Sequence, residues 1–159
     1  MEFDSEEWRA ERDRRLHEWV QDEAAVQFIL DFANAAEFFD DVVDQDKEIT
    51  RARAMKILFN VAAELPLNPF FDRYKGQLIP LIVAGINAWL DANEMEQGNF
   101  NDRVYAYVMR DFYMEMVPFI VYLTRGKKAM RTLSLEIRQF FTKHETLDQY
   151  VAKLEEKTA

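Results

Sequence analysis

Acidic side chains one helical turn apart are the part of this sequence with the clearest chemical potential. Asp40, Asp41 and Asp44 lie in the segment EFFDDVVDQD, residues 37–46. On a helix, Asp40 and Asp44 share a face because residues four apart lie one above the other. Carboxylates placed in this way can bind Mg²⁺, which prefers a few carboxylates completed by water or phosphate oxygens. The spacing is also typical of a solvated acidic helix face, the interpretation that we favour.

The order DDVVD resembles the aspartate-rich helix of the all-α isoprenoid synthases, the prenyl diphosphate and squalene/phytoene synthase families. In those families the pattern DDxxD binds magnesium ions that hold the substrate diphosphate. The segment RDFYMEM is similar to the second acidic motif of the squalene/phytoene branch. The resemblance implies a Mg²⁺-dependent diphosphate-binding protein. Its metal ligands would be Asp40, Asp44, Asp111 and Glu115. Its phosphate-binding residues would be Arg110 and Lys128.

The helix that carries the first acidic motif predicts which way its acids face. Apolar residues recur at steps of four and three on a helix from about Asp22 to Asp44: Phe28, Phe32, Ala35, Phe39 and Val42. At about 100° per residue, three acids point away from a seam centred on Phe39: Glu37, Asp41 and Asp44. Asp40 lies at the boundary of the seam. We therefore expect the phenylalanines of this helix inside and its acids in water.

The second acidic motif lies in the most apolar predicted helix, from about Asp102 to Thr124. An unpaired charge in such a helix is costly, so Asp111 and Glu115 need partners. Internal ion pairs with Arg103, Arg110 or a base of the following helix supply them without a ligand. We favour these ion pairs over a shared metal site, because structural networks often occupy such positions.

A basic cluster, TRGKKAMR, occupies residues 124–131 around Gly126. Backbone N–H groups at a helix start can receive phosphate, which is the basis for a role of Lys128 in binding one. The same bases follow the end of the preceding helix, where positive charge is favoured by the helix dipole. We favour helix capping, and this is the only basic cluster visible in the sequence.

Composition predicts an all-α fold. The chain has 159 residues, 49% of them apolar, which suits a single helical domain over residues 1–159. Four glycines and four prolines are too few for a sandwich of many short strands. Caps and breakers predict one bundle of six to seven helices with the apolar helix 102–124 at its centre. The predicted helices span about 6–20, 22–44, 51–64, 69–93, 102–124 and 128–143, with a short one after Thr146.

Several classes of protein are disfavoured by what the sequence lacks. It has no cysteine, which excludes disulfide frameworks and thiolate metal sites and favours the cytoplasm mildly. Its first residues are acidic and polar, unlike a secretory signal. The longest apolar stretches, 78–90 and 116–123, are shorter than the ~20 residues that a spanning helix needs. We expect a cytoplasmic protein without a membrane partner.

Charge is distributed unevenly. Residues 1–48 hold 16 acids and 5 bases, residues 49–124 hold 8 and 7, and residues 125–159 hold 5 and 8, which gives the net charge of −9. The acidic first part repels phosphates, so direct binding of nucleic acid is disfavoured. A protein partner with a basic surface is more compatible with this distribution.

Two tryptophans stand on the first helix, which is otherwise mostly charged. Residues 5–20 are therefore either a docking arm, anchored by Trp8 and Trp19, or a cap on the bundle, and both interpretations stay open.

The sequence as a whole favours a non-catalytic, acidic protein-binding protein, an adaptor or inhibitor. Its partner would be a protein with a basic surface or a second copy. The predicted partner-binding residues are Trp8, Trp19, Glu37, Asp41 and Asp44. No cofactor is expected, except Mg²⁺ if the diphosphate-binding alternative holds. A structural subunit of a homo-oligomer is the third possibility.

Overall fold

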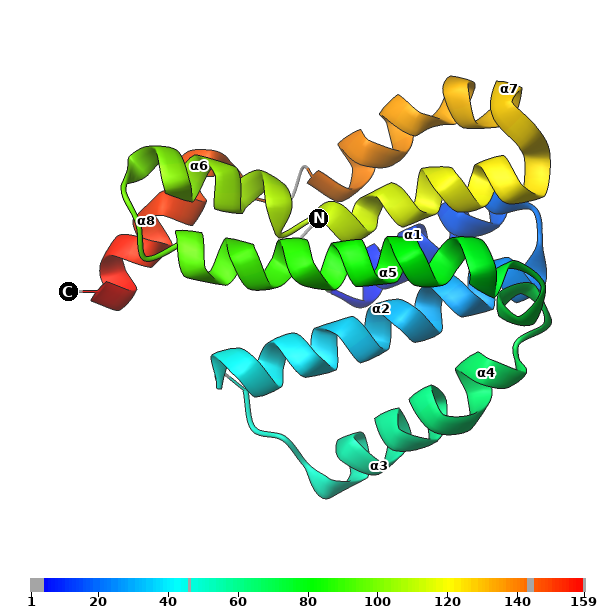
Figure 1. The fold of residues 1–159 in the computed structure, drawn as a ribbon, viewed down its shortest axis with the longest axis horizontal. Helices are drawn as coiled ribbons and strands as arrows, with labels where there is room; N and C mark the ends of the chain where they lie inside the picture. Colours follow the sequence, from blue (N-terminus) through cyan, green and yellow to red (C-terminus); the bar gives the residue numbers. More distant parts are fainter. Residues whose placement is uncertain (1–4, 46, 143–144, 159) are drawn as a thin grey trace.

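The computed structural model describes residues 5–45, 47–142 and 145–158, and in these ranges the chain is helical without any strand. The predicted all-α class is therefore confirmed (Figure 1). The helices are α1 (Glu6–Val20), α2 (Glu23–Asp44), α3 (Arg51–Phe59), α4 (Leu65–Leu67), α5 (Pro69–Met95), α6 (Phe100–Met109), α7 (Met116–Thr142) and α8 (Leu147–Thr158). A π-helical segment, Asn60–Glu64, joins α3 to α4, and a 3₁₀ segment, Phe112–Glu115, precedes α7.

The first helices begin at capping residues, close to the predicted helix starts. Ser5, Asp22 and Thr50 each accept a hydrogen bond from the backbone N–H three residues later, which satisfies a donor that the first helical turn leaves open. Asn68 caps α5 in the same manner, and its side-chain amide also donates to the carbonyl of Ala24 at 2.9 Å. The start of α5 is thereby tied to the start of α2.

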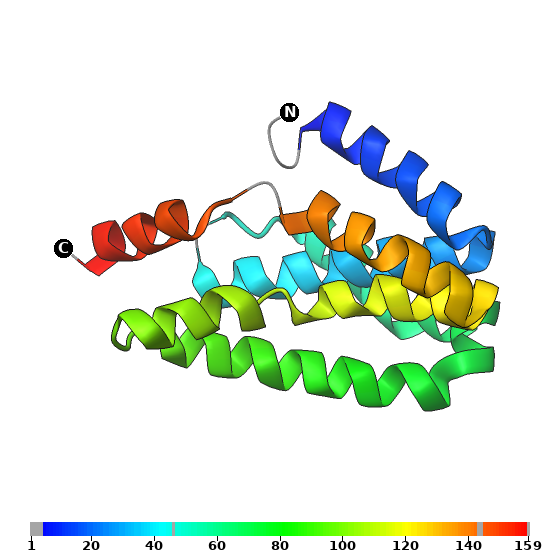
Figure 2. The same cartoon turned by 90° about the horizontal axis from the view of Figure 1, so that it is seen from above.

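The main hydrophobic core surrounds the first half of α7. Ile120 and Val121 have no exposed surface, and they pack with side chains of α1, α2 and α5. Figure 2 shows this part of α7 between α1 on one side of the bundle and α5 on the other. The prediction of a central apolar helix is confirmed for this segment. The same arrangement places α1 and α5 on opposite outer surfaces.

The predicted helix 102–124 is divided in the structure. α6 ends at Met109, and a turn leads into α7, where the N–H of Met114 donates to the carbonyl of Asp111 at 2.8 Å. Pro118 lies in the first turn of α7 and has no N–H to donate to residue 114, so one continuous helix would lose a hydrogen bond there. The prediction of a single helix was wrong because Pro118 favours a break in the turn that precedes it.

The chain reverses inside α7 at Gly126, as predicted. Gly126 has φ 83° and ψ 176°, so the helix is interrupted and its second half returns beside the first (Figure 1). The predicted end of that second half, Lys143, lies outside the described residues.

Two smaller hydrophobic clusters lie outside the main core. One joins α2 to α3 through Ala35, Phe38 and Ile57. The other joins α5, α6 and α8 through Ala92, Ala106 and Tyr150. In the described part of the chain no helix is both long and apolar enough to cross a membrane.

Replacing Gly126 with alanine should lower the free energy of unfolding by about 1–3 kcal/mol, because its backbone conformation is essentially restricted to glycine. Urea denaturation measures this change. Gly76→Ala is the matched control, since Gly76 is helical with no atom within 4 Å of an added Cβ. The free energy of unfolding of Gly76→Ala should rise by up to about 1 kcal/mol. Equal effects of the two substitutions would contradict the assigned turn.

Candidate functional site

The second half of α2 is oriented differently from the prediction. Asp41, expected in water, has only 3% of its surface exposed, whereas Phe39, the expected centre of the seam, is 51% exposed. Phe38 is buried in place of Phe39 and packs near Ile57 of α3. The prediction that the phenylalanines all face inward and Asp41 faces outward was therefore wrong. The cause is a tertiary contact, because α3 covers the side of α2 that carries Phe38 and Asp41.

Asp41 is the centre of an ion-pair network between α2, the following loop and α3. Its carboxylate lies 3.1 Å from Nζ of Lys47 and 2.6 Å from Nη1 of Arg53. The Arg53 contact is an ion pair outside the geometry of an aligned hydrogen bond. Glu37 adds weaker contacts at 3.6 and 3.7 Å to the same two bases. Asp41 is thus a buried anchor that is paired within the chain.

Asp40 of α2 contacts Trp89 of α5. The indole N–H of Trp89 donates to Oδ1 of Asp40 at 2.9 Å. Burial raises the pKa of Asp40 above its ordinary value, the hydrogen bond from Trp89 opposes this change, and the nearby Asp44 adds to it. Asp44 itself is exposed at the end of α2.

The second acidic motif is occupied by an internal ion pair. Arg138, on the second half of α7, donates to both carboxylate oxygens of Glu115, at 2.8 and 2.5 Å. This pair confirms the prediction that a base of the following helix satisfies Glu115. Asp111 lies close enough to Arg110 to raise the pKa of that guanidinium, against the effect of its burial.

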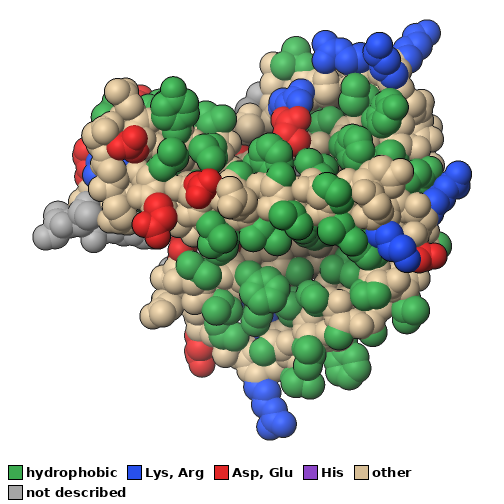
Figure 3. Space-filling view, viewed as in Figure 1, with side chains coloured by type: hydrophobic (Ala, Val, Ile, Leu, Met, Phe, Trp, Pro, Cys, Tyr) green, Lys and Arg blue, Asp and Glu red, His purple; other side chains and the backbone are tan. Residues whose placement is uncertain are grey.

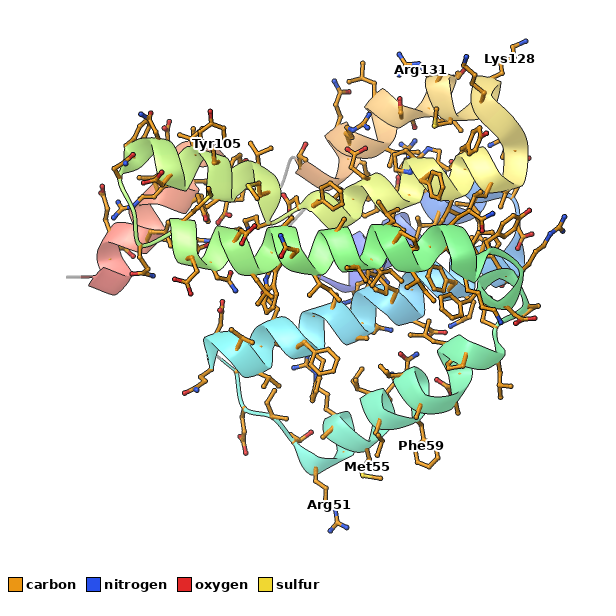
Figure 4. The ribbon with its side chains drawn as sticks, viewed as in Figure 1. Arg51, Met55, Phe59, Tyr105, Lys128 and Arg131 are labelled. Carbon is orange, nitrogen blue, oxygen red and sulfur yellow. The ribbon has the colours of Figure 1, made fainter. Side chains whose placement is uncertain are left out.

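The four acids predicted for a Mg²⁺ site do not form one group in the described part of the chain, although Arg110 lies near both Asp40 and Asp111. Within the described ranges, no three acidic or histidine side chains are grouped so that they could hold a metal ion, which includes Asp40, Asp44, Asp111 and Glu115. Arg110 contacts the ring of Tyr150 and the carboxylate of Glu145. Lys128 points into solvent beside the break of α7 at Gly126 (Figure 4).

The predicted docking arm, α1, packs on the rest of the protein. Trp19 is 2% exposed, and both tryptophans contact the rings of Phe140 and Phe141. Arg125 donates to the carbonyl of Trp19 at 2.6 Å, which caps the carboxyl end of α1. Trp19 is therefore not displayed to a partner, and the interpretation that α1 caps its own bundle is the one supported.

The acids of α1 are engaged by arginines of the same helix. Hydrogen bonds from Arg14 and Arg15 lower the pKa of Glu11 to about 2. Arg14 also pairs with Glu18, and Arg12 pairs with Asp13 at 2.8 Å. The acidic surface predicted from residues 1–48 is consequently weaker than the residue count implies.

An exposed apolar stripe on α5 was not identified in the sequence. Ile79, Val83, Ile86 and Leu90 are 46%, 60%, 51% and 49% exposed, at successive steps of four, three and four. No charged residue occurs from Gly76 to Leu90. Figure 3 shows hydrophobic side chains gathered over α5 and over the helices beside it. We refer to these four residues as the α5 stripe.

Further apolar side chains are exposed beside α5. On α6, Phe100, Tyr105 and Val108 are 62%, 62% and 66% exposed. On α3, Met55 and Phe59 lie along the outer edge, in line with Arg51 (Figure 4). Soluble monomers expose single apolar residues routinely, but extended sets of them indicate interaction sites. The spacing of the four apolar residues is visible in the sequence, but the sequence does not show that they are exposed to solvent.

Replacing Asp41 with asparagine should lower the free energy of unfolding by about 2 kcal/mol, because Lys47 and Arg53 lose their shared carboxylate. The cost stays below that of a fully buried pair, since both bases reach solvent. Asp44→Asn is the control and should change stability by less than about 0.5 kcal/mol. Urea denaturation of the two variants makes the comparison. Equal losses would rule out Asp41 as the anchor.

Replacing Asp40 with asparagine should raise stability at neutral pH by less than about 1 kcal/mol, because the side chain is partly exposed. The folded state holds the Asp40 proton more tightly than the unfolded chain, so Asp40 reduces stability as pH rises above its ordinary pKa of 3.8. Asparagine keeps an acceptor for Trp89. The gain should vanish on acidification below that value. Denaturation curves at both pH values test this, and a loss at neutral pH would contradict it.

The described residues thus combine charges that are paired within the protein with an exposed apolar surface on α5. Neither feature resembles a catalytic centre among the residues described. The likeness of DDVVD to the isoprenoid synthase motif stays a prediction, because no match bears on it. Comparison of the chain with family models, curated proteins and solved structures found no significant match.

Proposed function

We propose that this protein acts by binding protein, without catalysis, and that the α5 stripe binds a second copy of the chain. The observation that carries the proposal is the stripe itself. Four large apolar side chains are about half exposed on a helix surface that has no charge over fifteen positions, from Gly76 to Leu90. Burial of such a surface on association is favourable in proportion to the apolar area removed from water.

The spacing of the stripe supports a second copy as the occupant. Steps of four and three are the repeat by which two helices pack along a left-handed seam. A two-fold axis brings the same patch of both copies together, so the patch has to be complementary to itself. A neutral seam meets this condition because it sets no like charges against each other. The exposed residues of α6 beside it would extend the contact.

A basic protein partner is the weaker candidate. Several of the acids that favoured it are engaged within the chain, namely Glu11, Asp13, Glu18, Glu37 and Asp41. Asp44 is exposed and would still be available to a basic surface. The absence of cysteine supports a reducing compartment, so we place this activity in the cytoplasm.

Val83→Glu should weaken self-association by about tenfold or more, because it places two carboxylates at the centre of a two-fold seam and removes an apolar contact. Sedimentation velocity over a range of protein concentrations measures the change. The fold should be retained, since Val83 is 60% exposed and surface substitutions seldom alter stability by more than about 0.5 kcal/mol.

Gln77→Glu is the matched control, because it adds the same charge to an exposed position of α5 on another side of the helix. This variant should associate like the parent protein. A parent protein that is monomeric at every concentration would end the proposal of a second copy. Equal weakening by both substitutions would show that net charge, and not the stripe, controls association.

A further inference from the structure

A groove of about 480 Å³ lies where α1, α2 and α3 meet, and no residue of α5 is among those that line it. Cationic side chains from distant parts of the sequence line it: Arg9, Arg12, Lys47, Arg53 and Lys56. Glu37 is the one carboxylate among its lining residues, and Asn34 and Ile57 complete the wall. The fold therefore brings three cations of the acidic residues 1–48 together with two from the segment that follows.

Cations outnumber carboxylates among the residues that line the groove. Five cations and one carboxylate line it, a formal charge of +4, in a protein whose net charge is −9. Asp41 lies beneath Lys47 and Arg53, and Asp13 pairs with Arg12. Counting these two acids as well, cations outnumber carboxylates by five to three among these residues. Like charges gathered in one groove attract anions and raise their local concentration.

Two of the arginines are held in place by the protein. The Arg12 guanidinium lies 5.4 Å from the centre of the Trp8 ring and donates to Asp13 at 2.8 Å. The Arg53 guanidinium lies 5.6 Å from the Phe38 ring and contacts the buried Asp41. A guanidinium that is already oriented loses less entropy on binding, and its planar set of donors matches the oxygens of phosphate.

Lys56 is the most available cation of the groove. It is exposed, and among the described residues it makes no ion pair. The amide of Asn34 adds a neutral donor and acceptor, and Ile57 adds a small apolar surface. The volume falls within the ~300–1,000 Å³ typical of sites for small molecules.

From this arrangement we infer that the groove between α1, α2 and α3 binds a small phosphate-bearing anion with two or more negative charges. A soluble phosphate ester or diphosphate and the phosphorylated headgroup of a lipid share this chemistry. The soluble compound fits better, because cations from three sides face the groove. This site is separate from the residues Arg110 and Lys128 predicted from the sequence, and it needs no metal ion.

Titration calorimetry with sodium pyrophosphate tests the inference, at low ionic strength and with a chelator that removes divalent cations. The parent protein should bind with measurable heat, and added salt should weaken binding by screening the charges. Lys56→Glu should reduce the affinity by about tenfold or more, because a charge-assisted contact is lost and a repulsive charge is added. Thermal unfolding of the variant verifies that its fold is intact.

Lys128→Glu is the matched control, since it changes the net charge equally at an exposed site beside the break of α7 (Figure 4). It should bind pyrophosphate like the parent protein. Phosphatidylcholine vesicles containing phosphatidic acid, whose phosphomonoester can carry two negative charges, form a second arm, and binding to them that is lost in Lys56→Glu assigns the headgroup as the source. The absence of binding to both probes, or equal weakening by both substitutions, would overturn the inference.

The two proposals fail independently. Self-association is tested by Val83→Glu on α5, and anion binding by Lys56→Glu on α3. Each variant also serves as a control in the other experiment, because the α5 stripe and the groove share no residue.

Discussion

The buried carboxylate of Asp41 decides where α3 lies. α3 contributes only Ile57 to a fully buried cluster, so apolar packing holds it weakly among the described residues. The ion pairs of Asp41 with Lys47 and Arg53 add a directional link between α2, the loop and α3. A charge taken out of water needs such partners, and the partners in turn fix the chain that carries them. The position of α3 therefore follows from an electrostatic requirement as much as from burial.

The two proposed surfaces depend on this link to different degrees. The basic groove needs α3 beside α1 and α2, because Arg53 and Lys56 form one of its walls. Arg53 serves the anchor and the groove together, since its guanidinium contacts Asp41 from the groove side. The α5 stripe is independent of α3, because α5 is held by its capping residue Asn68 and by the main core. The bundle thus carries a polar and an apolar surface, each positioned by different interactions.

The sequence predicted the helical class and the starts of the first helices well, because caps and breakers act locally. It failed where one tertiary contact decides between neighbouring residues. Phe38 and Phe39 are both compatible with a seam that runs through Phe28 and Ala35, and α3 selects Phe38. That choice rotates the buried side of α2 by about one residue, or about 100°, and brings Asp41 inside. The sequence did not decide whether Trp19 contacts a partner or the protein's own helices for a comparable reason. A thin apolar stripe can pack against either one.

The candidate surfaces lay beyond local patterns. A repeat of four and three on α5 indicates a seam, but the folded chain alone decides whether a neighbouring helix covers it. The cations of the groove come from α1, the loop after α2 and α3, and three of them, Arg9, Arg12 and Lys47, lie among acids in the sequence. Counting charge along the chain therefore hides a local excess that appears only when these helices are assembled.

The division of the apolar contacts into one large core and two small clusters has a consequence for motion. Regions with few buried contacts open at lower free energy than the centre of a protein, and amide hydrogen exchange reports such openings. α3, held by the cluster around Ile57, and α8, held by the cluster around Tyr150, belong to this class. We expect their amides to exchange through local opening while the helices around Ile120 stay closed. An anion seated between α1 and α3 would slow exchange in α3 and leave α8 unchanged, so the two ends of the bundle respond separately.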